Sequence, residues 1–323
     1  MRLPKIIVAF IACLGVAACT SGSGIDGLGL SSETTSSIQR PNAPLTESVT
    51  PPEPVPYQSA VAEPAGEEEA PAEMAALVAP ERPQAADAAY ANIVINERRF
   101  RDAKPINFGK ASPKQLAVHG VDISRWQGDI DWAKLRGQGA NFVYIKATDG
   151  GDHLDPMFRK NWRDAEKAGL KRGAYHFFYW CRTAREQADW FIRNVPKVKG
   201  ALPPVIDVEW NHTSNCKKRP SRENVLEKMQ VFMDKLEAHY GQRPVIYTAP
   251  DFYADNLKGA FKNHPFWLRS VAAHPSKVYP GREWVFWQYS GSGLSHGVEG
   301  RIDLNVFHGD ENAWRKWLAR SAG

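Results

Sequence analysis

The clearest chemical signal in the 323-residue chain is a pair of acids, Asp207 and Glu209, inside the apolar stretch Pro203–Trp210. A short apolar run bounded by prolines is typical of a buried strand, in which residues two apart point to the same side. The two carboxylates would lie roughly 6.5 to 7 Å apart along the backbone, a spacing that suits acids flanking a bond to be cleaved. Burial of two acids is costly unless something pairs or uses them. Catalysis and salt bridging at a strand end are both open at this point.

Strand-like and helix-like segments alternate from His119 onward. The predicted strands are 119–124, 141–147, 172–178, 205–210, 244–248, 266–269, 285–289 and 301–304. The predicted helices are 132–138, 156–168, 183–194, 221–240, 250–261 and 311–320. Apolar strands separated by helices predict an α/β fold, an irregular TIM-like (β/α) barrel with parallel strands, and the helix connections after the sixth and seventh strands are weak. An open doubly wound sheet is the alternative, which the lack of a glycine-rich phosphate loop after the first strand disfavours.

The chemistry of such a barrel lies at the carboxyl ends of its strands. The polar residues predicted there are Asp122, Lys146, Thr148, Asp149, Tyr175, His176, Asp207, Glu209, Tyr247, Arg269, Gln288, Tyr289 and Asp303. Aromatic faces beside acids suit sugar rings, and the tryptophans in this region are Trp126, Trp180, Trp210, Trp267 and Trp287. Core packing is the alternative role for the tryptophans. No cluster has metal-ligand spacing and no Ser or Cys has the setting of a nucleophile, so neither metal nor cofactor is expected.

Residues 1–18 have the pattern of a signal peptide, with two basic residues and then the apolar run Ile6–Val16. The run is too short to cross a bilayer. The four residues that end at Cys19 resemble a bacterial lipobox, which implies that Cys19 is lipidated and anchors the protein to a membrane. Because Thr20 is not an aspartate, resemblance to known lipoprotein sorting favours the outer membrane, facing the periplasm. An ordinary cleavage site with an incidental Cys is the alternative.

Residues 19–95 are rich in Pro, Ala, Glu, Ser and Thr, and this composition predicts a disordered tether. A propeptide or a partner-binding tail is the alternative. Eleven acids and two bases give Thr20–Ile95 a charge of about −9, so the formal total of +5 leaves about +12 on Asn96–Gly323. A basic globular part favours an anionic polymer as partner, and an exported protein meets the cell wall rather than nucleic acid. Residues 96–117 are predicted as a lead-in segment on the surface of a domain over 118–323.

Two cysteines, Cys181 and Cys216, lie in the globular part. Export would place them in an oxidising compartment. Each follows a predicted strand by a few residues, which puts both in loops at the same end of the fold. We therefore predict a disulfide between them, with two free thiols as the alternative.

Seven blocks of the chain, in order, resemble the family 25 glycoside hydrolases, the lysozymes (muramidases) that cut peptidoglycan. The blocks are Gly120–Ser124 with Gln127–Gly128, Phe142–Gly150, Gly173–Phe177, Asp207–Glu209, Val245–Thr248, Trp287–Ser290 and Ile302–Asn305. They extend over about Val118 to Gly309. The chain departs from the family pattern at Asp149, where Glu is usual, at Leu268–Ser270, and in the insertion-like loop Asn211–Pro220.

The resemblance implies that Glu209 is the general acid, that Asp207 is its partner, and that Asp122 and Asp303 line the floor of the cleft. It also implies a substrate site formed by Tyr175, Tyr247, Trp267, Gln288 and Lys146. Crowding of carboxylates raises the pKa of at least one of them, as a proton donor at neutral pH requires.

The implied reaction is hydrolysis of the β-1,4 bond between N-acetylmuramic acid and N-acetylglucosamine. We expect the protein to be a monomer. The acid spacing falls between the separations typical of retaining and inverting enzymes. Attack by the substrate acetamide, oriented by Asp207, is the favoured hypothesis, and a covalent sugar on Asp207 is the alternative. A non-catalytic lipoprotein that ties the outer membrane to the wall is the alternative function. The presence of all four acids favours the enzyme.

Overall fold

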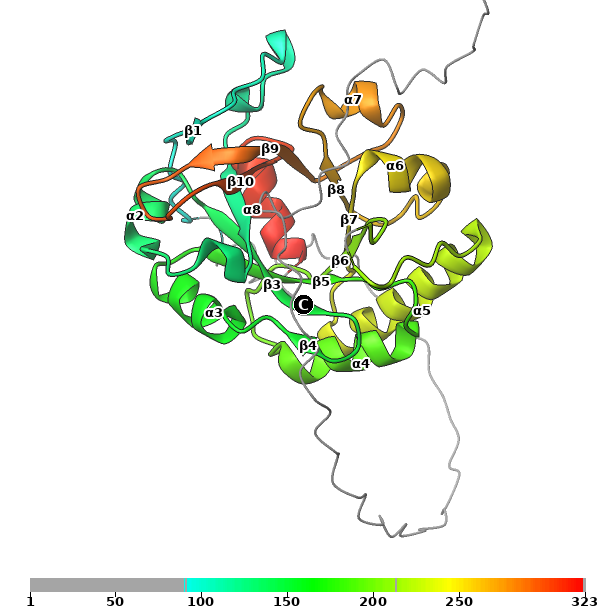
Figure 1. Ribbon diagram of the computed structural model, residues 1–323. Coiled ribbons are helices and arrows are strands. Elements are labelled where there is room, and N and C mark those ends of the chain that lie inside the picture. The colour runs from blue at the N-terminus through cyan, green and yellow to red at the C-terminus, as the bar shows by residue number, and fades with distance from the viewer. Residues whose placement is uncertain (1–89, 91, 213, 322–323) are drawn as a thin grey trace, which may run out of the picture. The chain divides into compact units, whose positions relative to one another are not determined.

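The computed structural model describes residues 90, 92–212 and 214–321 (Figure 1). The predicted signal peptide, Cys19 and most of the predicted tether lie outside these residues. Across the described part of the chain, no helix is both long and apolar enough to span a membrane. Eight of the strands in this part close into a barrel; in order around it they are β2 (His119–Ile123), β3 (Phe142–Asp149), β5 (Lys171–Phe177), β6 (Val205–Val208), β7 (Val245–Thr248), β8 (Phe266–Arg269), β9 (Phe286–Leu294) and β10 (Ile302–Phe307).

The predicted α/β barrel is confirmed, but the direction of its last strand differs from the prediction. The strands from β2 to β9 pair in parallel, whereas β10 is antiparallel to both of its neighbours. The connection between β9 and β10 is too short for the crossover that a parallel pair needs. Asp303 therefore lies near the start of β10 and not at its carboxyl end. The reversed direction still brings it to the expected edge of the barrel, because Asp303 is in register with Asp122.

Helices surround the barrel (Figure 1). Those around its wall are α2 (Trp132–Gly137), α3 (Phe158–Lys167), α4 (Ala184–Asn194), α5 (Arg222–Tyr240), α6 (Pro250–Phe252) and α7 (Pro275–Val278), whereas α8 (Glu311–Arg320) packs against one end of the barrel. The side chains of Asp131, Thr183, Ser221 and Asp310 accept backbone N–H bonds at the starts of α2, α4, α5 and α8, which explains why these helices begin there. The helix predicted over 250–261 is shorter, and α6 continues only as the π-helical turn Tyr253–Leu257.

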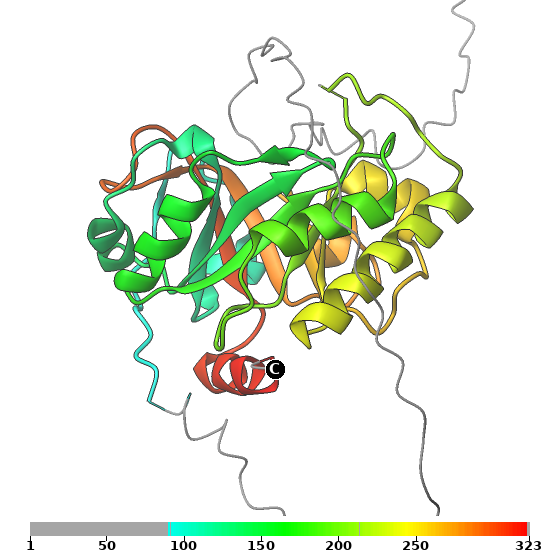
Figure 2. The same cartoon turned by 90° about the horizontal axis from the view of Figure 1, so that it is seen from below.

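Side chains alternate along each barrel strand, so the strands contribute to two cores. The outward-facing residues pack under the helices. Inward-facing residues at one end, among them Phe142 and Tyr144, form a second core, the inner core, with Trp314 and Leu318 of α8. Figure 2 shows α8 lying across this end of the barrel. A Cβ on Gly120 would lie 2.6 Å from the Phe142 ring, so glycine there makes room for the aromatic core.

The lead-in segment packs against the barrel and begins before the predicted boundary. Tyr90 and Ile95, placed in the tether by composition, are buried in the inner core beside α8 because they are large and apolar. Farther along, the short strand β1 (Arg101–Asp102) pairs antiparallel with the end of β9. Phe108 then meets Trp287 edge-on at 4.9 Å between ring centroids. The segment thus covers β9, where the connecting helices are short.

Candidate active site

The inward-facing residues at the end of the barrel opposite α8 are polar. They are Asp122, Lys146, Asp207, Glu209, Arg269, Gln288, Asp303 and Asn305, and all are buried. They alternate with outward-facing apolar residues on the same strands, as the period of a strand requires. The four acids predicted to be catalytic are therefore brought to one end of the barrel.

The pKa of the Tyr175 hydroxyl reflects the carboxylates around it. Burial raises its pKa well above the usual value, and the charges of Asp122, Asp207, Asp155 and Asp303 raise it further. Four carboxylates from different elements thus lie within electrostatic range of one hydroxyl. Tyr175 therefore lies among the acids, and its contact with the substrate stays a prediction.

Asp122 is held by two amides. Its Oδ2 accepts a hydrogen bond from Gln288 Nε2 at 2.9 Å and one from Asn305 Nδ2 at 2.7 Å. The hydroxyl of Tyr247 donates to Gln288 Oε1 at 2.9 Å, and so extends the network across the barrel. Burial raises the pKa of Asp122 to about 6, although the two amide bonds and Arg269 oppose the shift. Tyr247 and Gln288 therefore orient an acid as well as lining the site.

Asp207 and Glu209 occupy the end of β6. Asp207 is in register with Tyr247 on β7 and with Phe177 on β5. Glu209 lies just beyond the strand, which ends at Val208. Burial raises the pKa of the Tyr247 hydroxyl well above the usual value, and the charges of Glu209 and Asp207 add to the shift. Both acids of the DxE motif therefore act electrostatically on the network that holds Asp122.

Two residues of the predicted substrate site have other partners. Lys146 Nζ forms an ion pair with Asp149 Oδ2 at 2.6 Å, and both side chains are buried. Trp267 donates its indole N–H to Asn305 Oδ1 at 2.8 Å and stacks on Tyr144 at 5.0 Å. The geometry makes Trp267 a support for the Asp122 network and not a platform for a sugar.

Core packing accounts for most of the tryptophans predicted near the site. Trp180, Trp210, Trp267 and Trp287 are all buried. Trp126 is partly exposed, with the guanidinium of Arg125 4.6 Å from its ring centroid. Of these five residues, Trp126 is the one placed to offer an aromatic face to a ligand.

Asn305 and Asp155 were not predicted as site residues, and Arg269 was predicted at this end of the barrel but without a role in the site. Asn305 shares a strand face with Asp303 because the two are two residues apart, the same signal that identified Asp207 and Glu209. Arg269 ends β8 and lowers the pKa of Asp122. Asp155 lies in a loop, where it accepts backbone N–H bonds from Arg125 and Met157 at 2.9 Å. No local pattern marks Asp155 as part of the site.

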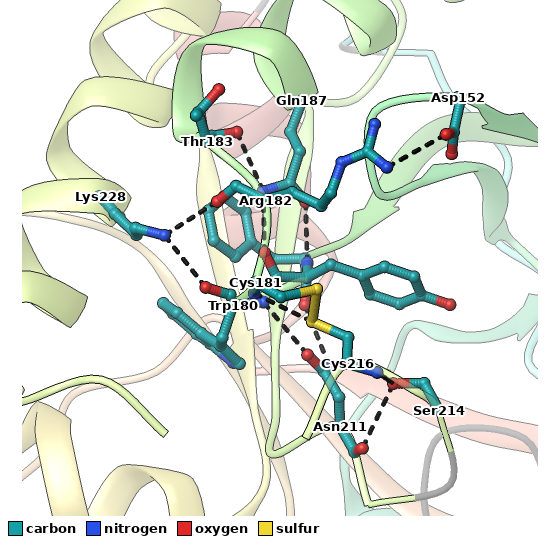
Figure 3. Close-up of a disulfide and its surroundings, with 12 residues drawn as sticks. Asp152, Trp180, Cys181, Arg182, Thr183, Gln187, Asn211, Ser214, Cys216 and Lys228 are labelled. Atoms are coloured by element: carbon teal, nitrogen blue, oxygen red, sulfur yellow. Dashed lines mark hydrogen bonds and ion pairs between the residues drawn. A yellow bond between two sulfur atoms is a disulfide. The ribbon is translucent and has the colours of Figure 1, made fainter. Parts of the chain in front are cut away.

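Cys181 and Cys216 form the predicted disulfide, with their Cα atoms 5.5 Å apart (Figure 3). It links the loop after β5 to the loop after Glu209 and Trp210. Among the described residues, no group of three or more His, Cys, Asp and Glu side chains is arranged to hold a metal ion. The site therefore consists of a cluster of buried acids, of which Asp122 is held by amide donors, and a disulfide joins two of the loops at the rim of this end of the barrel.

The family model described as glycosyl hydrolases family 25 matches residues 121–298. The chain is 38% identical over 221 residues to the Uncharacterized protein YegX of Escherichia coli O157:H7, covering 66% of this chain and 78% of YegX. It is 34% identical over 200 residues to Lysozyme M1 of Streptomyces globisporus, covering 59% of this chain and 68% of that protein. Its structure is similar to that of a family 25 glycosyl hydrolase from Bacillus anthracis, with 41% identity and a TM-score of 0.58 over 62% of this chain and 94% of that one.

Proposed function

This chain belongs to the glycosyl hydrolases of family 25, and from that premise we propose that it cleaves the β-1,4 bond between N-acetylmuramic acid and N-acetylglucosamine in peptidoglycan. Its relative in Streptomyces globisporus is a lysozyme by name. The observation that carries the proposal is the set of four buried acids at one end of the barrel, Asp122, Asp207, Glu209 and Asp303. A basic globular part suits an anionic wall polymer.

In this proposal Glu209 is the general acid. It gives its proton to the glycosidic oxygen as the bond to the anomeric carbon breaks. The carbonyl oxygen of the 2-acetamido group attacks that carbon, and Asp207 orients the acetamide and stabilises its positive charge. Water then opens the cyclic intermediate and gives up a proton to the Glu209 carboxylate. A covalent sugar on Asp207, detected by trapping and mass analysis, would overturn the acetamide route.

The reaction is tested by release of reducing ends from purified sacculi. We expect Glu209→Gln to lower kcat by about 10²- to 10⁴-fold, the usual contribution of a general acid. The matched control is Glu237→Gln on α5, whose carboxylate pairs with Arg243 at the surface and which should leave kcat unchanged. If the wild-type chain binds sacculi but releases no reducing ends, the function is glycan binding and not hydrolysis.

We further propose that residues 1–18 export the chain and that lipid on Cys19 anchors it to the outer membrane, with the following residues as the tether to the wall. The support is the leader pattern and the composition of residues 19–89. Mass analysis of the mature N-terminus should find acylated Cys19, and Cys19→Ala should release the protein from the membrane fraction. An unmodified N-terminus would remove the anchor from the proposal and leave the hydrolase untouched.

A further inference from the structure

The loop Phe178–Thr183, which follows β5, holds the backbone of both catalytic candidates. Phe178 donates its N–H to the carbonyl of Asp207 at 3.0 Å. Two residues later, Trp180 donates its indole N–H to the carbonyl of Glu209 at 2.7 Å. Because Glu209 lies beyond the end of β6, the strand ladder does not fix its backbone. The indole bond therefore helps to set where the Glu209 carboxyl can reach.

Lys228, on α5, holds this loop from the other side. Its ammonium donates to the carbonyl of Trp180 at 3.0 Å and to that of Arg182 at 2.8 Å. Figure 3 shows the side chain reaching from the helix to these two carbonyls, which flank Cys181. A single cation thus ties the loop to a 19-residue helix at the position next to the disulfide.

The Trp180 side chain is itself fixed in place. Its ring is buried and stacks on Phe252 with centroids 4.9 Å apart. Its backbone N–H donates to Asn211 Oδ1 at 3.2 Å, and Asn211 Nδ2 donates to the carbonyl of Phe178 at 3.1 Å. Asn211 is two residues after Glu209, so the loop is hydrogen-bonded to the chain on both sides of Glu209.

We propose that Lys228 is a positioning residue for catalysis: through the carbonyls of Trp180 and Arg182 it fixes the loop that places Glu209 for proton transfer. The inference rests on the proposed function. Proton transfer requires the donor to lie within hydrogen-bond reach of the glycosidic oxygen, and a displacement of about 1 Å can cost about 10²-fold in rate. Substrate affinity depends on the whole cleft, so the loss falls on kcat and not on KM.

The test uses the full chain and soluble peptidoglycan fragments, with kcat and KM measured for three variants. Lys228→Met removes both carbonyl bonds and should lower kcat about 10- to 100-fold with KM unchanged within about twofold. Lys228→Arg keeps a cation with several donors and should restore kcat to within about threefold of wild type. The matched control is Lys235→Met, two turns along α5. Lys235 forms an ion pair of 2.6 Å with Asp189 and no hydrogen bond to the loop Phe178–Thr183. The kcat of this control should stay within about twofold of wild type.

Unfolding by urea accompanies each variant, so that a loss of folded protein is not taken for a loss of rate. If Lys228→Met does not fold, Lys228→Gln replaces it. Wild-type kcat in Lys228→Met, an equal loss in Lys235→Met, or no recovery in a folded Lys228→Arg would each overturn the inference. A wild-type chain that releases no reducing ends would instead refute the proposed function, and the inference with it.

Discussion

The two halves of the barrel interior are built by the same strands and differ in chemistry. On β3, Tyr144 belongs to the inner core and Lys146 to the polar end; on β6, Val205 and Asp207 divide in the same way. One alternation step along a strand therefore separates an aromatic core from a cluster of buried charges. Apolar packing at the aromatic end therefore offsets the free-energy cost of burying the charges at the polar end.

The two halves are also held differently. The end near α8 is held by ring packing, as where Trp314 meets Phe307 at 5.0 Å and Phe142 at 5.6 Å. The opposite end is held by directed bonds: the amides on Asp122, the ion pair of Lys146 and the disulfide at the rim. Buried carboxylates carry a desolvation cost that packing elsewhere must offset.

The largest expected effect is a loss of stability when the packing of the apolar end near α8 is disrupted. Trp314→Ala removes a fully buried ring from α8 and should lower the free energy of unfolding by about 3–5 kcal/mol. The rate per folded molecule should not change, because the polar end lies at the other edge of the strands. Urea unfolding and kcat, corrected for the folded fraction, measure the two effects. A large fall in kcat in the folded variant would show that the halves are not separable.

The sequence predicted the barrel, because the alternation of apolar strands and helices is a local pattern, and it predicted the disulfide from two cysteines in loops at the same end of the fold. It also placed the four acids at the correct edge of the barrel, although Asp303 lies near the start of β10 and not at its carboxyl end. It did not predict that α8 closes the barrel, since an amphipathic helix shows that it has an apolar face but not what that face covers. Nor did it predict the partner of Asp122: Asn305 is 183 residues away, and only the antiparallel return of β10 brings them together. Strand direction depends on the length of the connection and on closure of the barrel, which a local pattern does not contain.

A smaller effect is expected at the rim of the polar end. The disulfide links residues 35 positions apart. For a loop of this length, loss of the disulfide lowers the free energy of unfolding by about 2–4 kcal/mol. Replacing both Cys181 and Cys216 by Ser should produce this loss and also faster hydrogen exchange in the two loops that they join. Reductant should reproduce the effect in the wild type and do nothing to the double variant. Unchanged exchange in these loops would mean that their other hydrogen bonds are sufficient.

The smallest expected effect has the opposite sign and depends on pH. The pKa of Asp122 is raised from 3.8 to about 6 in the folded protein, so the folded state binds more protons than the unfolded state between these values. The stability from this group is full below about pH 4 and is lost as the pH rises through about 6.

Asp122→Asn removes the charge, and its amide oxygen can still accept from both Gln288 and Asn305, since these bonds share one oxygen of the carboxylate. We therefore expect it to raise the free energy of unfolding at pH 7 by about 1–3 kcal/mol, with little gain at pH 4 and lower activity at both. The control, Asp131→Asn, removes a surface carboxylate whose pKa is lowered by bonds from Lys134, so any change should have the opposite dependence on pH. If Asp122→Asn gains the same stability at pH 4 as at pH 7, the ionised Asp122 carboxylate carries no desolvation cost. Apolar packing near α8 would then have no such cost to offset at this residue.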